Sequence, residues 1–401
     1  MFFYIILAVI FPLLVQKYLL YQTVLSTVFT EFYYDISGLI PRTIPILFGI
    51  PLILIIIVNL LKISERYYVI ALSVQIGIIL IICFFGFKKW ANFDAEEIMA
   101  YDYLVRNKQW AEVLEYNTKK PPQNYLSLAM LNLALAKTGL LGDKMFNYDQ
   151  HGLDGLFLIF NKIGYTTPLM GNEILYHLGF INASQKYTFE AMEIIPNKDK
   201  SARTIIRLAE TNLINGQYKV SEKYLKLLEK TIFYRKWAKN TMEYLYNEDK
   251  INDHPDWGEK RKYKVKNDYF FDIQNMEEAL INMVEDNPGN KIAFEYLMAA
   301  YLINKDLANF IKYFPGIENF NYKEVPISYQ EAMIYIILLN KKNPIPNATR
   351  YVNENIIKRL NSYISIYTTY PDAMVRLRKD FWGTYWYYLH FSDIENMTLG
   401  K

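Results

Sequence analysis

Apolar residues recur at the spacing of an α-helix along most of this chain, and the stretch 201–230 shows the pattern most clearly. Its first half carries apolar residues three or four positions apart, namely Ile205, Leu208, Ala209 and Leu213. Gly216 follows, at a position that would end this helix. The second half carries a similar stripe, Tyr218, Ser221, Leu225 and Leu228. We therefore predict two helices joined by a short turn, a unit that buries its apolar faces by stacking on similar pairs.

Three apolar stretches near the N-terminus have a different character: 2–20, 44–61 and 67–87. The last two contain no charged residue, and a run of about 20 apolar residues can cross a bilayer as a helix. We predict a transmembrane domain over residues 1–89 with about three spans. The polar Asn59 and Gln75 lie within these spans, and we interpret them as interhelical hydrogen-bonding groups rather than as parts of an ion path.

The distribution of charge bears on partners and on orientation. The formal net charge is +3, and the excess of basic residues lies before residue 90, so the remainder is electrically balanced and a nucleic-acid surface is not expected. Lys62 and Arg66 favour one orientation, whereas four other basic residues favour the opposite one: Lys17, Arg42, Lys88 and Lys89. The side of the membrane that the C-terminal region faces is therefore left open. The single cysteine, Cys83, excludes an intramolecular disulfide.

Residues 90–401 read as a domain of helical hairpins. Hairpin patterns occur at 95–119, at 290–314 and, for the leading helix alone, at 125–139. Leu178-Gly179 followed by Ala191 has the spacing of Leu208-Ala209 followed by Ser221, which places these two hairpins 30 residues apart (208 − 178). The series is interrupted by an irregular insertion at 141–171. From about residue 325 the chain stays helical but loses the motif, as expected of a terminal cap.

The stretch 201–230 resembles the tetratricopeptide repeat. Five residues fall on the large, small, turn, aromatic and small positions of that motif, namely Leu208, Ala209, Gly216, Tyr218 and Ser221, while Ile205 takes the tryptophan position. The resemblance covers roughly residues 95–314. It implies an all-α, right-handed superhelix whose concave face commonly holds a peptide or another protein, and it supplies no catalytic residues.

The layout as a whole, with membrane spans followed by helical repeats, is similar to that of uncharacterised multi-span membrane proteins of Gram-negative bacteria. In those proteins the membrane part is typically longer. The similarity implies an integral membrane protein of the bacterial inner membrane, with the lipid bilayer as one of its partners.

Candidate chemistry is sparse. The sequence contains no hydrolase elbow, Walker loop, HExxH motif or EF-hand loop, and its four histidines are far apart: His151, His177, His254 and His390. We therefore predict no catalytic, cofactor-binding or metal-binding residue and no cofactor. The insertion 141–171 gathers several polar residues, Asp143, Lys144, Asp149, His151 and Asp154, and it is either a ligand-binding loop or a packed connection, of which we favour the second.

Two further segments have alternative interpretations. The basic run 259–266 is either a contact for anionic lipid headgroups or a solvated loop, and we favour the loop. The aromatic residues between 381 and 391 form either a partner-binding surface or the closing layer of the helical core, and we favour the closing layer.

Together these observations predict a membrane-anchored scaffold or adaptor without enzymatic activity. Its helical repeats would present a surface for a protein or peptide partner on the concave face, in a bacterial envelope assembly. The alternative is an accessory part of a membrane enzyme that acts on lipid-linked sugar or envelope polymer, with its chemistry near Asp35, Arg42 or the insertion 141–171.

Overall fold

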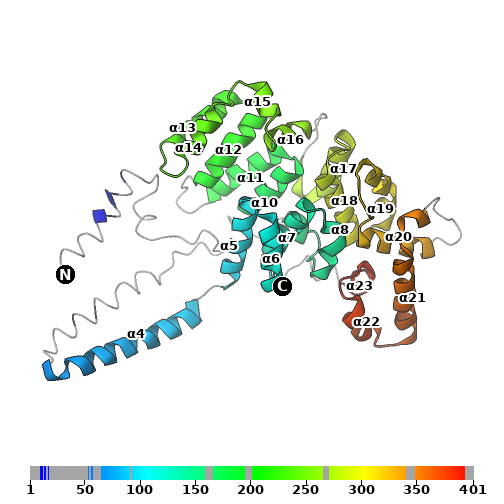
Figure 1. Ribbon diagram of the computed structural model, residues 1–401, viewed down its shortest axis with the longest axis horizontal. Coiled ribbons are helices and arrows are strands. Elements are labelled where there is room, and N and C mark those ends of the chain that lie inside the picture. Colours follow the sequence, from blue (N-terminus) through cyan, green and yellow to red (C-terminus); the bar gives the residue numbers. More distant parts are fainter. Residues whose placement is uncertain are drawn as a thin grey trace. The chain divides into compact units, whose positions relative to one another are not determined.

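The computed structural model describes residues 65–90, 93–158, 166–194, 201–264, 271–339 and 348–392, with a few isolated positions before residue 65. The described residues form helices and turns and contain no strand, which confirms the all-α prediction for this part of the chain (Figure 1). Contacts between Cα atoms divide the chain into two units. The first comprises Met1–Glu96 with Met192–Ser201, and the second comprises Glu97–Ala191 with Ala202–Lys401.

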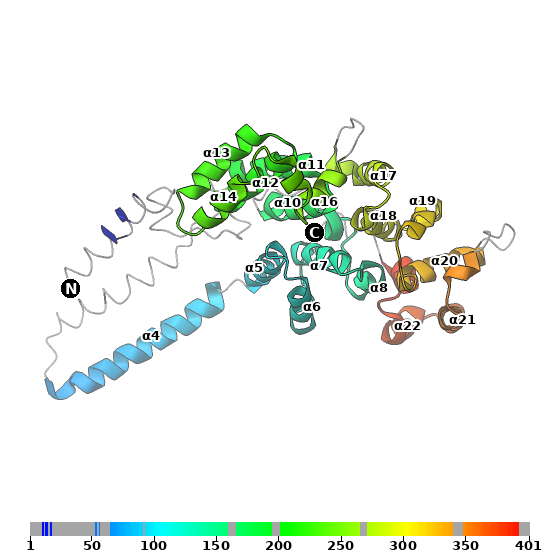
Figure 2. The same ribbon diagram turned by 45° about the horizontal axis from the view of Figure 1, so that its top comes forward.

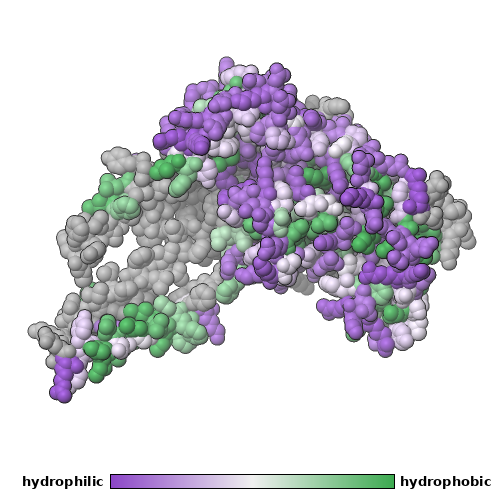
Figure 3. Space-filling model, viewed as in Figure 1, coloured by the Kyte–Doolittle hydropathy of each residue, from purple (hydrophilic) through white to green (hydrophobic). Residues whose placement is uncertain are grey.

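The first unit contains a long apolar helix, α4 (Tyr68–Trp90), preceded by the short η1 (Glu65–Tyr67). The stretch Tyr68–Gly86 is 19 residues long with a mean hydropathy of 2.7, and Figure 3 shows hydrophobic residues along it. Among the described residues this is the one helix long and apolar enough to cross a membrane. It corresponds to the predicted span 67–87. The predicted spans 2–20 and 44–61 lie outside the described residues, apart from isolated positions.

The second unit is a series of helices, many of them joined by short turns. Their bounds are α5 (Phe93–Arg106), α6 (Trp110–Lys119), α7 (Tyr125–Lys137), α8 (Leu141–Lys144), α9 (Asp154–Phe157), α10 (Thr166–Leu178), α11 (Ile181–Ile194), α12 (Ala202–Ile214), α13 (Tyr218–Glu229), α14 (Arg235–Met242), α15 (Glu248–Asn252), α16 (Trp257–Lys262), α17 (Met276–Asp286), α18 (Lys291–Ile303), α19 (Leu307–Tyr313), α20 (Ile327–Leu339), α21 (Glu354–Thr369), α22 (Ala373–Phe381) and α23 (Tyr385–Phe391).

Five of these helices end in the same backbone arrangement. Each is followed by a residue in the left-handed region, namely Lys108, Gly139, Gly179, Gly216 and Lys305. After α12, the N–H of Gly216 donates to the carbonyl of Leu213, and the N–H of Gln217 donates to the carbonyl of Asn212. The same two bonds occur after α5, α7, α10 and α18. This Schellman motif satisfies carbonyls that a helix end leaves free, and it sets the turn into the next helix.

The predicted register of the hairpin around Leu178 is wrong. Gly179 has a φ of +99° and lies in the turn after α10, so it corresponds to Gly216 and not to Ala209. The spacing of these two turns is therefore 37 residues (216 − 179), not 30. A glycine can serve either as a small residue inside a helix or as the left-handed residue that follows one, and the apolar pattern alone does not distinguish these roles.

Hydrogen bonds between paired helices confirm the corrected register. Ser221 Oγ on α13 donates to the carbonyl of Ala209 on α12, at 2.8 Å. At the corresponding place in the preceding pair, Ser184 Oγ donates to the carbonyl of Asn172, at 3.0 Å. Both serines are buried, so a small residue at this position lets the two helix backbones approach closely.

Helix α7 is the centre of the second unit. Every residue from Leu126 to Ala136 is buried, and the helix packs against α6, α8, α9, α10 and α18 (Figures 1 and 2). Helix α18 also packs against α8 and α10, and Asn290 at its start donates from Nδ2 to the carbonyl of Leu178. The chain thus returns to helices formed more than a hundred residues earlier. A simple stack, in which each pair contacts only its neighbours, does not describe this unit.

The range 141–171 contains α8, the short η2 (Met145–Asn147), α9 and the first residues of α10, and residues 159–165 within it lie outside the described residues. Its described part is packed. Asn132 Nδ2 of α7 donates to Gln150 Oε1 at 2.9 Å and to the carbonyl of Gly155 at 2.8 Å. Asp143 Oδ1 accepts the N–H of Ile327 at 2.7 Å, at the start of α20. These bonds favour the interpretation as a packed connection.

The C-terminal helices close around aromatic side chains. Trp386, Tyr387 and Phe381 are buried in one cluster, whereas Trp382 is exposed at a cavity of about 200 Å³ that Asp149 also lines. Glu331 of α20 holds this region together, because its Oε2 accepts the N–H of Tyr385 and its carbonyl accepts the indole N–H of Trp386. Burial raises the pKa of the Glu331 carboxyl to about 7, although the bond from Tyr385 opposes that rise.

We expect Gly216→Ala to destabilise the protein by about 1 kcal/mol, because a residue with a Cβ disfavours the left-handed region. A Cβ at this position would meet no described atom within 4 Å, so the cost comes from the backbone alone. Gly289→Ala is the matched control, since its Cβ is also unobstructed and its φ is ordinary. Thermal unfolding of the full chain in detergent, followed by circular dichroism, checks this. Equal melting temperatures for the two variants would contradict it.

Glu331→Gln tests the buried carboxyl. The folded pKa of about 7 lies above the unfolded value of roughly 4.3, so the stability that the protonated carboxyl contributes is lost as pH rises between these values. Glutamine keeps the acceptor for Tyr385 without the charge. We expect the variant to be more stable than the wild type at pH 8, by about 4 kcal/mol at most, and to match it near pH 4. The control is the exposed Glu324→Gln, and parallel pH profiles for Glu331→Gln and wild type would refute the expectation.

Candidate functional site

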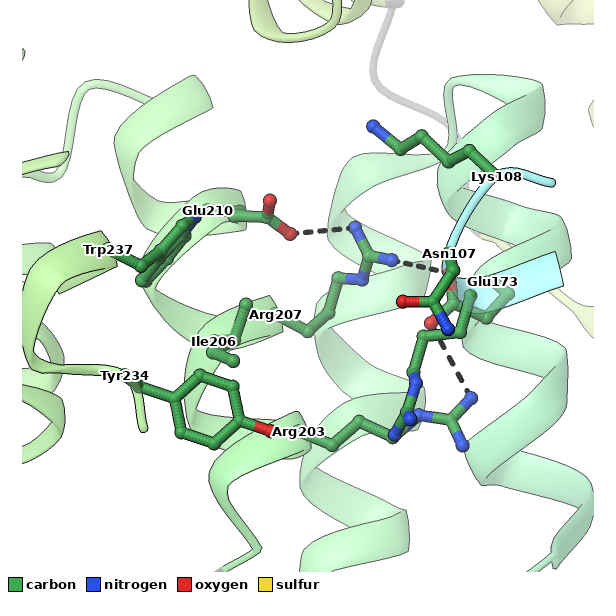
Figure 4. Close-up of a pocket in the computed structure, with 10 residues that line it drawn as sticks. Asn107, Lys108, Glu173, Arg203, Ile206, Arg207, Glu210, Tyr234 and Trp237 are labelled. Carbon is green, nitrogen blue, oxygen red and sulfur yellow. Dashed lines mark hydrogen bonds and ion pairs between the residues drawn. The ribbon is translucent and has the colours of Figure 1, made fainter. Parts of the chain in front are cut away.

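An open cavity of about 290 Å³ lies in the second unit, between the end of α5, helices α10 and α12, and the start of α14 (Figure 4). The residues that line it are mainly charged or aromatic: Arg106, Asn107, Lys108, Glu173, Arg203, Ile206, Arg207, Glu210, Tyr234 and Trp237. The aromatic side chains of Tyr234 and Trp237 lie on one side, and Asn107 and Lys108 lie on the other, with the arginines between them.

Arg203 forms part of the buried floor. Its guanidinium donates to both carboxylate oxygens of Asp102, at 2.7 and 2.8 Å, and to the carbonyl of Leu169, at 3.1 Å. The side chains of Arg203 and Asp102 are only 7% and 0% exposed. Two parallel charge-assisted bonds are the geometry in which arginine and a carboxylate tolerate burial. The pair therefore fixes α12 to α5 and, through Leu169, to α10.

Arg207 lies one turn further along α12. It donates to Glu173 Oε2 at 2.5 Å and to Glu210 Oε2 at 2.9 Å, and its guanidinium carbon lies 3.6 Å from the centre of the Tyr176 ring. Glu173 also lies 3.5 Å from Arg203, so this carboxylate joins the two arginines. Burial raises the pKa of Glu210, although the charge of Arg207 opposes the rise. We call the set Asp102, Glu173, Arg203, Arg207 and Glu210 the ion network.

A second set of bonds fixes the turn after α5, where Lys108 lines the cavity. Asp256, at the start of α16, accepts bonds from Lys108 Nζ at 2.8 Å and from the Tyr176 hydroxyl at 2.9 Å. Burial opposes ionisation of Asp256, but the charges of Lys108 and Lys260 and the two hydrogen bonds lower its pKa to about 2. Asp256 therefore stays ionised and ties the turn after α5 to α16.

The basic run 259–266 is not a free basic surface in its described part. Lys260 is 0% exposed and lies 2.8 Å from Glu259. Arg261 donates to the carbonyls of Leu213 and Ile214, at 3.2 Å each, which are the last two residues of α12. A cationic side chain at a helix C-terminus donates hydrogen bonds to the free carbonyls there and is attracted to the negative end of the helix dipole. Lys260 and Arg261 are therefore engaged within the protein, whereas Lys262 and Lys264 are exposed.

His177 is buried close to the cavity and packs edge-on against Trp110, with ring centres 5.2 Å apart. Burial and the nearby charges of Lys137 and Lys260 hold its pKa well below the ordinary value, so the imidazole is neutral. Burial and Lys260 likewise lower the pKa of Lys137 to about 8.

The described residues contain no group of three or more histidine, cysteine, aspartate or glutamate side chains placed to hold a metal ion.

The groups available to a ligand are those at the rim. The arginines of the floor are engaged by carboxylates of the chain itself, whereas Arg106 and Asn107 are exposed. Tyr234 and Trp237 lie across the opening from Asn107. This arrangement can bind an anionic group beside an apolar one. The ten lining residues include no serine, cysteine or histidine.

The structure does not bring the sequence-predicted polar residues into this cavity. Asp35 and Arg42 lie outside the described residues, and Asp143 is engaged at the start of α20. Sequence reasoning missed the ion network. A signal was present in α12, where Arg203, Arg207 and Glu210 lie four and three residues apart, on one face of a helix and away from the apolar stripe.

A family model matches residues 1–392, which is nearly the whole chain. The matching family is described as a family of unknown function, DUF6057. The chain belongs to this family. No curated protein and no solved structure matches the chain. The DUF6057 match runs through both units, so the segment that contains α4 and the helical unit that contains the cavity are parts of one family architecture.

We expect Asp102→Asn to destabilise this DUF6057 protein by about 3 kcal/mol, because it leaves Arg203 buried without its carboxylate. The double variant Asp102→Leu with Arg203→Met should lose less stability than Asp102→Asn, since it leaves no unpaired charge of this pair buried. Glu115→Gln, which breaks an exposed pair with Lys119, is the control and should change stability little, because exposed ion pairs are screened by solvent. Chemical unfolding of the full chain in detergent measures all three. A loss for Asp102→Asn no larger than the control's would rule out the structural role of the pair.

Proposed function

We propose that this protein is a membrane-anchored scaffold or adaptor that binds a protein partner through its helical unit. The paired helices with repeated Schellman turns support a tetratricopeptide-like interpretation of α5–α6, α10–α11, α12–α13 and α18–α19, in a series that folds back on itself at α7. The cavity described above is the proposed binding site for a segment of that partner.

The membrane part of the proposal is supported by α4. Tyr68–Gly86 has the length and the apolar composition of a membrane-spanning helix, and none of it is buried inside the protein. The two further spans, 2–20 and 44–61, and a place in a bacterial inner membrane belong to the proposal as well. The anchor would hold the helical unit at the bilayer surface, where an envelope assembly is within its reach.

The cavity is the observation that carries the binding part. Its floor is fixed by the ion network, so the rim groups are held in place before a ligand arrives, and preorganisation lowers the cost of binding. Arg106 supplies positive charge at the rim, whereas Lys108 is paired with Asp256, and Tyr234 and Trp237 supply aromatic surface. The complementary ligand is a peptide segment that carries a carboxylate close to an apolar side chain. Arginine and large aromatic residues are also the side chains that most often dominate binding energy at interfaces.

The alternative role, in an enzyme that acts on lipid-linked sugar or envelope polymer, receives no specific support from the described residues. Asp143 is committed to the N–H of Ile327, and Gln150 and Gly155 are bonded to Asn132. We therefore develop the binding proposal alone.

Crosslinking in native membranes tests the proposal. A photoreactive amino acid at Asn107, on the rim of the cavity, should yield a crosslinked protein, and the same amino acid at Ser362, exposed on α21, should not. Arg106→Glu should lower the yield about tenfold, which corresponds to a loss of about 1.4 kcal/mol in binding. Lys358→Glu on α21 is the matched charge reversal and should leave the yield unchanged.

Two results would count against a binding cavity. One is a yield at Asn107 no greater than that at Ser362. The other is an equal effect of Arg106→Glu and Lys358→Glu, because a general change in surface charge would then explain the loss.

A further inference from the structure

The loop between α13 and α14 exposes apolar side chains at its tip. Phe233 is 85% exposed and the neighbouring Ile232 is 57% exposed. Phe233 is the most exposed large apolar side chain among the described residues, and it lies at the end of a helix pair that otherwise buries its apolar stripe. Adjacent exposed apolar residues of this size usually mark a surface that something else covers.

Basic residues lie along the two helices that flank this tip. Between 218 and 245 the exposed basic side chains outnumber the acidic ones; they are Lys219, Lys223, Lys226, Lys230, Arg235, Lys236 and Lys239. Several of them line an open hollow of about 610 Å³ beside the loop, together with Glu229. Glu229 lies 3.8 Å from Lys239, and its backbone carbonyl accepts a bond from Arg235 Nε. Lys226 is paired with Glu222 at 2.6 Å, so two carboxylates stand against four cations and the hollow keeps a net positive charge.

We infer that the α13–α14 loop docks on the surface of an anionic lipid bilayer. In this arrangement Ile232 and Phe233 enter the boundary between headgroups and acyl chains, and the surrounding lysines and Arg235 contact lipid phosphates. An apolar tip inside a basic ring is complementary to such a surface in both polarity and charge. Long basic side chains also place their aliphatic stems beside the tip while their charged ends stay in the headgroup layer.

The positive charge beside the tip and the short connection to α4 favour a bilayer as the occupant. Only two residues separate the end of α4 at Trp90 from the start of α5 at Phe93. Helix α5 is 14 residues long, about 21 Å, and Arg106 at its end lines the same cavity as Tyr234, which follows Phe233 directly. A bilayer that holds α4 is therefore within reach of the loop. This inference rests on the membrane anchorage that we propose above.

Fluorescence of the full chain in lipid nanodiscs tests the inference, with an environment-sensitive probe on a single cysteine. The natural Cys83 in α4 reports on the anchor. In a Cys83→Ser background, Ile232→Cys reports on the loop and keeps Phe233, while Ser362→Cys is the exposed control. Nanodiscs with and without phosphatidylglycerol are compared, and spin-labelled lipids serve as quenchers.

We expect the Ile232→Cys probe to shift to the blue and to be quenched in nanodiscs that contain phosphatidylglycerol, and the Ser362→Cys probe to do neither. Raising the salt concentration, or combining Lys230→Glu with Lys236→Glu, should reduce the loop signal several-fold, because screening and charge reversal weaken attraction to the headgroups. Phe233→Glu should abolish it. The Cys83 probe should report burial in every case.

Three results would overturn the inference. The first is a loop probe that emits like the Ser362→Cys control in both lipid mixtures while the Cys83 probe reports burial; in that case the anchor stands and the loop contact fails. The second is a Cys83 probe exposed to water, in which case the anchorage itself fails. The third is a loop probe that becomes buried only after membrane proteins are added, since a protein would then cover the tip.

Discussion

The arrangement of the second unit depends on charged groups that are buried where three helices meet. Asp102 of α5, Glu173 of α10 and the arginines of α12 come from three different hairpins, and none of them can be buried without the others. Arginine suits this role because its planar guanidinium forms several bonds in fixed directions. The ion network therefore does more than add stability. It permits one relative placement of the three helices, and that placement creates the cavity and orients its rim.

Local patterns in the sequence were sufficient to predict the helical hairpins. The apolar stripe and the turn glycine at 216 predicted α12 and α13, and the same reasoning predicted α5–α6 and α18–α19. The pattern failed at Gly179, because a small residue within a helix and a left-handed residue after one look alike in sequence. It also failed to show that α18 returns to α7. Every residue from Leu126 to Ala136 is buried, and a helix that is buried on all sides has no apolar stripe to indicate which face its partners contact.

The candidate site was beyond sequence reasoning for a related reason. Asp102 and Arg203 are 101 positions apart, and an aspartate and an arginine on predicted helices look like ordinary surface residues until the helices meet. The basic run 259–266 shows the opposite error, because a cluster that reads as a surface contains the fully buried Lys260. Charge in a sequence indicates which groups need partners. Only the packing of the helices determines whether the partner is the chain itself, a lipid or another protein.

The ion network couples three helices into one body. Hydrogen–deuterium exchange on the full chain, compared between the wild type and Arg203→Met, measures this coupling. We expect amide protection to fall together in α5, α10 and α12, while α20 and α23, which are held by Glu331, keep theirs. A loss of protection confined to α12 would contradict this coupling, because the three helices would then be positioned by apolar packing without the network.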